Sequence, residues 1–128
     1  MLLNTTYFPL VWMKLGSAGI DTGDEGFATF EALLLREEPF VLLDADNSQR
    51  EEREHSHEER KQLSLWMKRH KAALRAFVKG QINVEPDAGK QATISTFAPM
   101  FEAFWGYPLF VVNTQEEAFK VADRLLAN

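Results

Sequence analysis

The fold of this chain is decided by a short apolar run, Phe40-Val41-Leu42-Leu43, which leads directly into Asp44-Ala45-Asp46-Asn47-Ser48. A wholly apolar run of this length, followed by polar residues, is typical of a central strand that enters a loop. Such strands are covered on both faces. The run therefore predicts a sheet that is flanked by helices.

The residues before this run predict one strand and one helix. Residues 7–15 are rich in β-forming residues and predict a strand with an early proline, Pro9. Residues 26–37 predict a helix that Pro39 ends, because apolar residues recur three and four apart. Those apolar residues are Phe27, Phe30, Leu33 and Leu34.

The residues after the run continue the alternation. The longest helix is expected from Ser56, which forms a capping box with Glu59, to about Ala76. A third strand is expected over 77–84, and residues 86–89 predict a turn.

The last third of the chain predicts two more helices around a strand. Residues 93–105 have helical spacing but contain Pro99, which costs about 3 kcal/mol in a helix interior, so we expect a kink or two short pieces. A fourth strand is expected over 109–112, and a second capping box at 114–117 opens the final helix. The order is then βαβαβαβα, which implies one α/β domain over residues 1–128 with a largely parallel sheet.

The composition excludes several classes of protein. The chain has 128 residues and no cysteine, which excludes disulfide frameworks, thiol nucleophiles and cysteine zinc sites. A net charge of -5 argues against nucleic-acid binding, which needs a basic surface. No stretch reaches the roughly 18 apolar residues of a membrane span, and the amino terminus lacks the basic segment of a signal peptide. We expect a soluble cytoplasmic protein.

Two carboxylates follow the central strand, and ligands of parallel sheets usually bind beyond the carboxyl ends of strands. Asp44 and Asp46 match aspartyl-phosphate phosphatases, in which one carboxylate is the nucleophile and magnesium ligand and the next is the acid or base. Such enzymes also need a lysine and a second acidic pair, whereas Asn113 follows the last strand. Glu85 and Asp87 offer further carboxylates, but such residues at a strand end more often cap helices or form turns. The structural interpretation is therefore favoured.

The histidines and glycines also favour structural roles. His55 and His57 are two residues apart and point apart on a helix, whereas metal-binding pairs are usually four apart. His70 lies on the apolar stripe of the long helix, which predicts a hydrogen-bonded, partly buried side chain. The glycines between residues 16 and 26 match neither a dinucleotide-binding loop nor a P-loop, so we expect a flexible turn there. No metal and no cofactor is expected.

Aromatic residues gather near the carboxyl-terminal third of the chain. Helical spacing places most of these rings in the core. A helix interrupted by proline cannot hide every ring, however, and an apolar patch or groove of this kind marks a partner or a lipid-like ligand. The rings with helical spacing are Phe97, Phe101, Phe104 and Trp105.

Several longer stretches share local patterns with a known family. They are Gly23-Asp24-Glu25-Gly26-Phe27, residues 39–44, residues 66–74 with Lys79-Gly80, and residues 107–112 with 116–119. In these stretches the chain resembles the SpoIIAA-like group of STAS-related domains, also described as STAS/SEC14-like. The resemblance implies a small α/β domain of four or five strands, no catalysis, and a role in protein interaction or ligand sensing.

The resemblance does not extend to the phosphorylation motif of the family. STAS antagonists that are switched by phosphorylation carry an Asp-Ser-x-Gly motif at the start of the helix after a central strand. Ser48 and Ser56 fall in that region here, but neither has the preceding aspartate or the glycine.

We therefore expect a non-enzymatic, STAS-like regulatory or protein-interaction module, whose partner is another protein or a second copy of the chain in a homodimer. The alternative is a domain that binds a small apolar or lipid-like molecule, and a magnesium-dependent phosphohydrolase that uses Asp44 and Asp46 is least favoured. The candidate ligand or partner surface consists of Asp44, Asp46, Ser48, Phe97, Phe101, Phe104 and Trp105.

Overall fold

Strands and helices alternate along most of the chain. The computed structural model describes residues 2–14, 25–44 and 57–127. Its elements are β1 (Leu2–Asn4), β2 (Leu10–Lys14), α1 (Glu25–Leu35), β3 (Phe40–Asp44), α2 (His57–Phe77), β4 (Val78–Val84), α3 (Ala88–Trp105), β5 (Leu109–Val112) and α4 (Gln115–Ala127).

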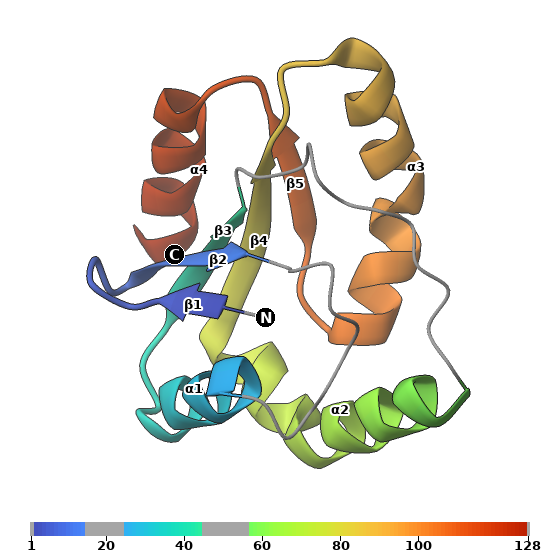
Figure 1. The fold of residues 1–128 in the computed structure, drawn as a ribbon. Coiled ribbons are helices and arrows are strands. Elements are labelled where there is room, and N and C mark those ends of the chain that lie inside the picture. Colours follow the sequence, from blue (N-terminus) through green and yellow to red (C-terminus); the bar gives the residue numbers. More distant parts are fainter. Residues whose placement is uncertain (1, 15–24, 45–56, 128) are drawn as a thin grey trace.

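The strands form one five-stranded sheet whose spatial order, β1-β2-β3-β4-β5, is the chain order (Figure 1). β1 is antiparallel to β2, and every other neighbouring pair is parallel. The predicted class, an α/β domain with a four- or five-stranded parallel or mixed sheet and flanking helices, is confirmed at this level.

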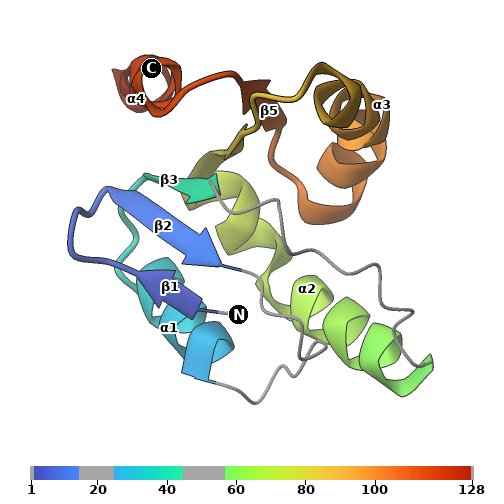
Figure 2. The same ribbon diagram turned by 45° about the horizontal axis from the view of Figure 1, so that its top comes forward.

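The helices divide unequally between the two faces of the sheet (Figures 1 and 2). Each parallel strand lies beside the previous one, so successive right-handed crossovers place α1, α2 and α3 on the same face. Those helices share one core cluster with Phe40 and Leu42 of β3, whereas α4 packs against Val41 and Leu43 on the opposite face. This two-sided burial explains why the central strand is wholly apolar, and it confirms the prediction for this run.

Trp66 of α2 lies at the centre of the larger cluster. Its ring makes edge-to-face contacts with Phe27 and Phe30 of α1, with centroids 5.1 Å and 5.4 Å away. Edge-to-face pairs at this distance are favoured by the aromatic quadrupole. The indole therefore joins the two helices that cover this part of the sheet.

The amino terminus differs from the prediction. Residues 7–15 were expected to form one strand, but β2 begins only at Leu10, because a turn with hydrogen bonds from Phe8 N to Thr5 O and from Leu10 N to Tyr7 O precedes it. This turn allows the unpredicted strand β1 to pair antiparallel with β2. The antiparallel edge makes the sheet mixed.

The other predicted boundaries agree within two residues, apart from the start of α3. Helix α1 ends before the predicted residue 37, because Glu37 adopts a positive φ of 56° that a helix cannot continue. Helix α2 ends at Phe77, and the proposed cap Ser56 lies outside the described residues. Strand β5 has the predicted bounds.

Helix α3 corrects two predictions. Residues 86–89 were expected to form a turn, but Asp87 is the N-cap and the helix begins at Ala88. Pro99 was expected to kink the helix or to divide it into two short pieces, and the structure excludes the second outcome, because α3 is one helix with this proline inside it. Pro99 and Ser95 are both exposed, so the carbonyl group that Pro99 leaves without an amide donor is hydrated at little cost.

Candidate functional site

Polar residues gather at the carboxyl edge of the parallel strands. Asp44 ends β3, is fully buried, and lies opposite Asn83 of β4 in the sheet register. Asp44 already has an interaction partner in the folded chain, so it is not a free residue. The other two polar residues of the candidate surface, Asp46 and Ser48, lie outside the described residues.

The carboxyl groups that follow β4 act as structural groups. Oε1 of Glu85, which is buried, accepts a hydrogen bond of 3.1 Å from the backbone N of Asp87. The side chain of Asp87 in turn accepts a bond of 2.9 Å from Lys90 N and so caps α3. The interpretation of these two residues as cap and turn formers is confirmed.

Gln91 connects the two loops at this edge. Its side-chain amide donates to the carbonyl oxygen of Glu85 and to Oδ1 of Asn113, which follows β5. Glu117 N donates to Thr114 Oγ1, which confirms Thr114 as the cap of α4, whereas Glu117 Oε2 accepts from Asn113 N and not from Thr114 N as in a full capping box. The carboxyl ends of β4 and β5 are thus held together by side-chain hydrogen bonds.

Two buried amides lie on the sheet beneath the three helices, and sequence reasoning missed them. Gln81 and Asn83 of β4 are 4% and 2% exposed, and Gln81 Nε2 donates to Asn83 Oδ1 over 3.1 Å. A buried polar group that lacks a partner costs about 1–3 kcal/mol, so most buried side-chain amides in folded proteins are hydrogen-bonded. The available signal was their position: two polar residues alternate with Ile82 and Val84 in a strand that should be apolar on both faces.

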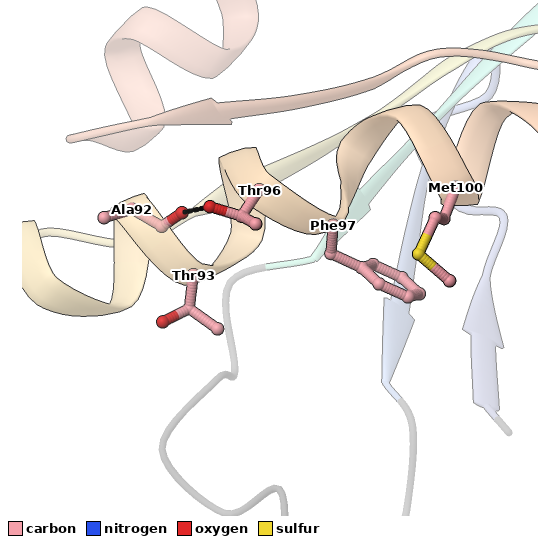
Figure 3. Close-up of a pocket in the computed structure, with 5 residues that line it drawn as sticks. All are labelled: Ala92, Thr93, Thr96, Phe97 and Met100. Carbon is pink, nitrogen blue, oxygen red and sulfur yellow. Dashed lines mark hydrogen bonds between the residues drawn. The ribbon is translucent and has the colours of Figure 1, made fainter.

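An apolar stripe runs along α3. It consists of Phe97, Met100 and Phe104, which are 50%, 68% and 49% exposed, and we call it the α3 stripe. Phe97 and Met100 project from the same side of the helix, as does Thr93 (Figure 3). Together with Ala92 and Thr96 they line an open groove of about 460 Å³.

The remaining aromatic side chains of this segment anchor α3. Phe101 is buried in the core cluster, and its ring packs edge-to-face on Tyr107 with centroids 5.5 Å apart. Trp105 is partly buried and packs against both of them. Of the four rings with helical spacing, Phe101 is buried and Trp105 is partly buried, so fewer are core than expected, whereas the expected excess at the surface is confirmed by Phe97 and Phe104.

The hydroxyl group of Tyr107 lies in the same core. Burial raises the pKa of this group well above its ordinary value, because the charged phenolate would lose its hydration. Tyr107 is therefore a neutral core residue.

His70 belongs to a small polar cluster between α1 and α2. Its Nδ1 donates to the carbonyl oxygen of Trp66 over 2.8 Å, and its ring stacks on the Trp66 indole with centroids 4.4 Å apart. Trp66 Nε1 donates to Glu31 Oε1 over 2.6 Å, and His70 Nε2 lies 3.8 Å from the same oxygen. The prediction of a hydrogen-bonded, partly buried histidine is confirmed.

Within residues 2–14, 25–44 and 57–127, no three His, Asp or Glu side chains come together in a way that could hold a metal ion. In the same part of the chain, no helix is long and apolar enough to cross a membrane. No protein-family model, no curated protein and no solved structure matches this chain.

Proposed function

We propose that this chain is a non-enzymatic interaction module, similar to the SpoIIAA-like, STAS-related domains, that binds a protein partner through the α3 stripe. The observation that carries the proposal is the exposure of Phe97, Met100 and Phe104 along one helix. Single exposed apolar residues are common, but aromatic and methionine side chains grouped on one surface are enriched at protein interfaces.

The surroundings of the α3 stripe suit such a contact. Lys90 and Glu102 are the two charged residues of α3, so the stripe can be buried without desolvating many charges. The helix is anchored by Phe101 in the core, whose ring also contacts Phe97 with centroids 6.3 Å apart. A partner therefore contacts apolar side chains on a helix that the core supports. Binding costs little conformational entropy, because this helix is already ordered.

Site-specific photocrosslinking tests this proposal. A photoreactive phenylalanine analogue is introduced in place of Met100 and, as a matched control, in place of Leu35, which ends α1 and is 82% exposed. The proposal requires a discrete crosslinked species from position 100 in cells that express the protein, and none from position 35. Equal crosslinking from both positions, or none from position 100, contradicts it.

A second copy of the chain is the simplest partner. Sedimentation velocity over a range of protein concentrations separates self-association from a foreign partner. If the partner is a second copy, Met100→Asp shifts the dimer to monomer while Leu35→Asp does not. If the wild type is monomeric throughout, the crosslinked species contains another protein.

The open groove beside Phe97 and Met100 favours a second candidate function, the binding of a small apolar or lipid-like molecule. The uncharged fluorescent probe N-phenyl-1-naphthylamine tests it. Saturable enhancement that Met100→Asp abolishes and Leu35→Asp preserves supports this function. Equal enhancement by the wild type and the Met100→Asp variant contradicts it.

A further inference from the structure

We propose that the buried amides of Gln81 and Asn83 form a binding site for a small neutral ligand that carries an N–H donor beside a carbonyl acceptor, that is, a carboxamide or a cyclic amide. This site is separate from the α3 stripe, because it belongs to the sheet and not to the outer surface of a helix. It therefore stands or falls independently of the proposed function.

The fold places both amides on one face of β4, with Gln81 at the middle of the strand and Asn83 near its carboxyl end. Their neighbours Ile82 and Val84 belong to the cluster beneath α4, so Gln81 and Asn83 project to the opposite face, which α1, α2 and α3 cover. Asn83 is the penultimate residue of β4 and pairs with Asp44, the last residue of β3. The carboxyl edge of parallel strands is where open α/β sheets usually bind ligands.

Within the part of the chain that the structure describes, the hydrogen bonds of the pair are incomplete. Two carboxamides together offer two carbonyl oxygens and two NH2 groups, and the single bond between Gln81 and Asn83 uses one of each. Whichever way the two amides are oriented, one carbonyl oxygen and one NH2 group are left over. Among the described residues, neither side chain makes another hydrogen bond, although both are at least 96% buried.

The chemistry of the leftover groups selects the class of ligand. The leftover donor and acceptor belong to two side chains that are hydrogen-bonded to each other, and a small molecule can satisfy both if it carries an acceptor and a donor bonded to one carbon, as an amide does. Carboxyl groups flank the pair, since Asp44 pairs with Asn83 and Glu85 follows two residues later, and both are buried. When ionised, these groups repel an anion, so a carboxylate or phosphate ligand is disfavoured.

Titration with acetamide tests the proposal on the wild-type chain. In ¹⁵N-labelled protein, we expect the side-chain NH2 signals of Gln81 and Asn83 to shift and saturate as acetamide is added. Acetate, which is anionic, and acetone, which has the acceptor but no N–H donor, should leave these signals unchanged at the same concentrations. The NH2 signal of Gln62, an exposed amide on α2, is the internal control.

Two results of the titration overturn the proposal. One is the absence of saturation, which would show that the leftover groups are satisfied by water or by internal rearrangement. The other is an equal shift at Gln62, which would show a general solvent effect. Crosslinking through position 100 does not depend on either result, so failure here and failure of the proposed function are distinguishable.

Replacement of the pair by apolar residues of similar shape provides a second measurement. We expect Gln81→Met combined with Asn83→Leu to raise the thermal midpoint by a few degrees and to abolish the response to acetamide, because the variant buries no unpaired polar groups. The matched control is Gln62→Met, which should change neither. A lower midpoint, or loss of folding in the double variant, would show that the amides are satisfied in the folded chain and would overturn the proposal.

Discussion

Glu31, Trp66 and His70 join α1 to α2 through one shared carboxylate oxygen. Glu31 Oε1 accepts the indole N–H, and His70 Nε2 lies 3.8 Å from it. Because Trp66 is also the aromatic centre of the larger core cluster, this polar contact fixes the orientation of the indole that the core needs. The sequence predicted the environment of His70 but gave no indication of Glu31, which is distant in the chain.

Removal of this carboxylate should destabilise the protein. Glu31→Ala leaves the partly buried Trp66 N–H without its acceptor, and we expect the free energy of unfolding to fall by about 1–2 kcal/mol. Urea denaturation measures this change. Glu38→Ala is the control, because it removes only an exposed contact with Arg36 and should change the stability by less than about 0.5 kcal/mol. Equal losses from both variants would contradict the role of Glu31.

Tyr107 should make the stability sensitive to alkaline pH. Burial raises the pKa of its hydroxyl in the folded protein above the value in the unfolded chain, so the unfolded chain releases this proton first as the pH rises. Its effect on stability is therefore absent below about pH 10, and above it the free energy of unfolding falls by up to about 1.4 kcal/mol per pH unit. Tyr107→Phe should remove this dependence.

Urea denaturation between about pH 9 and pH 11 measures the effect of Tyr107. Tyr7→Phe, at a tyrosine that is 64% exposed, is the matched control and should retain the wild-type dependence on pH. If the Tyr107→Phe variant loses stability with the wild-type slope, then ionisation of Tyr107 does not limit stability at high pH.

The start of helix α3 was wrongly predicted from a local sequence pattern. Its first turn was predicted to be a loop because Pro86, Asp87 and Gly89 all favour turns, yet Asp87 and Lys90 form the hydrogen bond of an N-cap. The same residue types serve both structures, because aspartate favours helix N-caps as well as turns. Pro99 likewise does not divide the helix, although its ring removes one backbone hydrogen bond.

The carboxyl end of α3 depends on a glycine. Gly106 has a φ of 88°, and its N–H donates to Glu102 O over 2.8 Å. A Cβ atom there would also lie 2.7 Å from Cγ of Arg75. We therefore expect Gly106→Ala to lower the free energy of unfolding by about 1–2 kcal/mol, as measured by thermal or urea denaturation.

The matched control for this glycine lies at the other end of α3. Gly89 has no positive φ, and its added Cβ would approach only Asp87 Oδ2, at 3.3 Å. Gly89→Ala should be neutral or stabilise by up to about 1 kcal/mol, because alanine favours the helix. If both substitutions have the same effect, the left-handed conformation at Gly106 is not what ends the helix.

In the fold as a whole, α4 packs alone among the described helices on one face of the sheet. Three helices cover one face of the sheet, whereas α4 covers the other, where it meets Val41, Leu43 and Ile82 (Figure 2). Ala118 and Ala122 are fully buried at this contact, which allows the helix backbone to approach the strands closely. The close approach leaves no room for larger side chains.

Enlargement of one of these alanines should therefore separate α4 from the sheet. We expect Ala122→Leu to lower the free energy of unfolding by about 1–3 kcal/mol through overpacking. The same substitution at Ala127, which is exposed at the end of α4, should change it by less than about 0.5 kcal/mol. Urea denaturation of the two variants decides, and a neutral Ala122→Leu would show that the contact has space to spare.

The amino-acid sequence was sufficient for the elements whose residues interact locally. The apolar run at residues 40–43, the spacing of Leu33 and Leu34, and the capping box at 114–117 each act over a few residues, so their outcome can be read from the chain. The alternation of these elements was also sufficient for the α/β class. The pairing of β1 with β2 was not predictable, because three residues form a strand here only when a partner edge is available.

Tertiary packing decided the features on which the two proposals rest. Helical spacing placed Phe97, Phe101 and Phe104 on one helix, but contact with the core decided which rings are buried and which form the α3 stripe. Gln81 and Asn83 are ordinary polar residues in the sequence, and they become a candidate site only because the fold buries both on one face of a central strand. The physical reason is the same in both cases: burial depends on what covers a side chain, and the covering residues are distant in sequence.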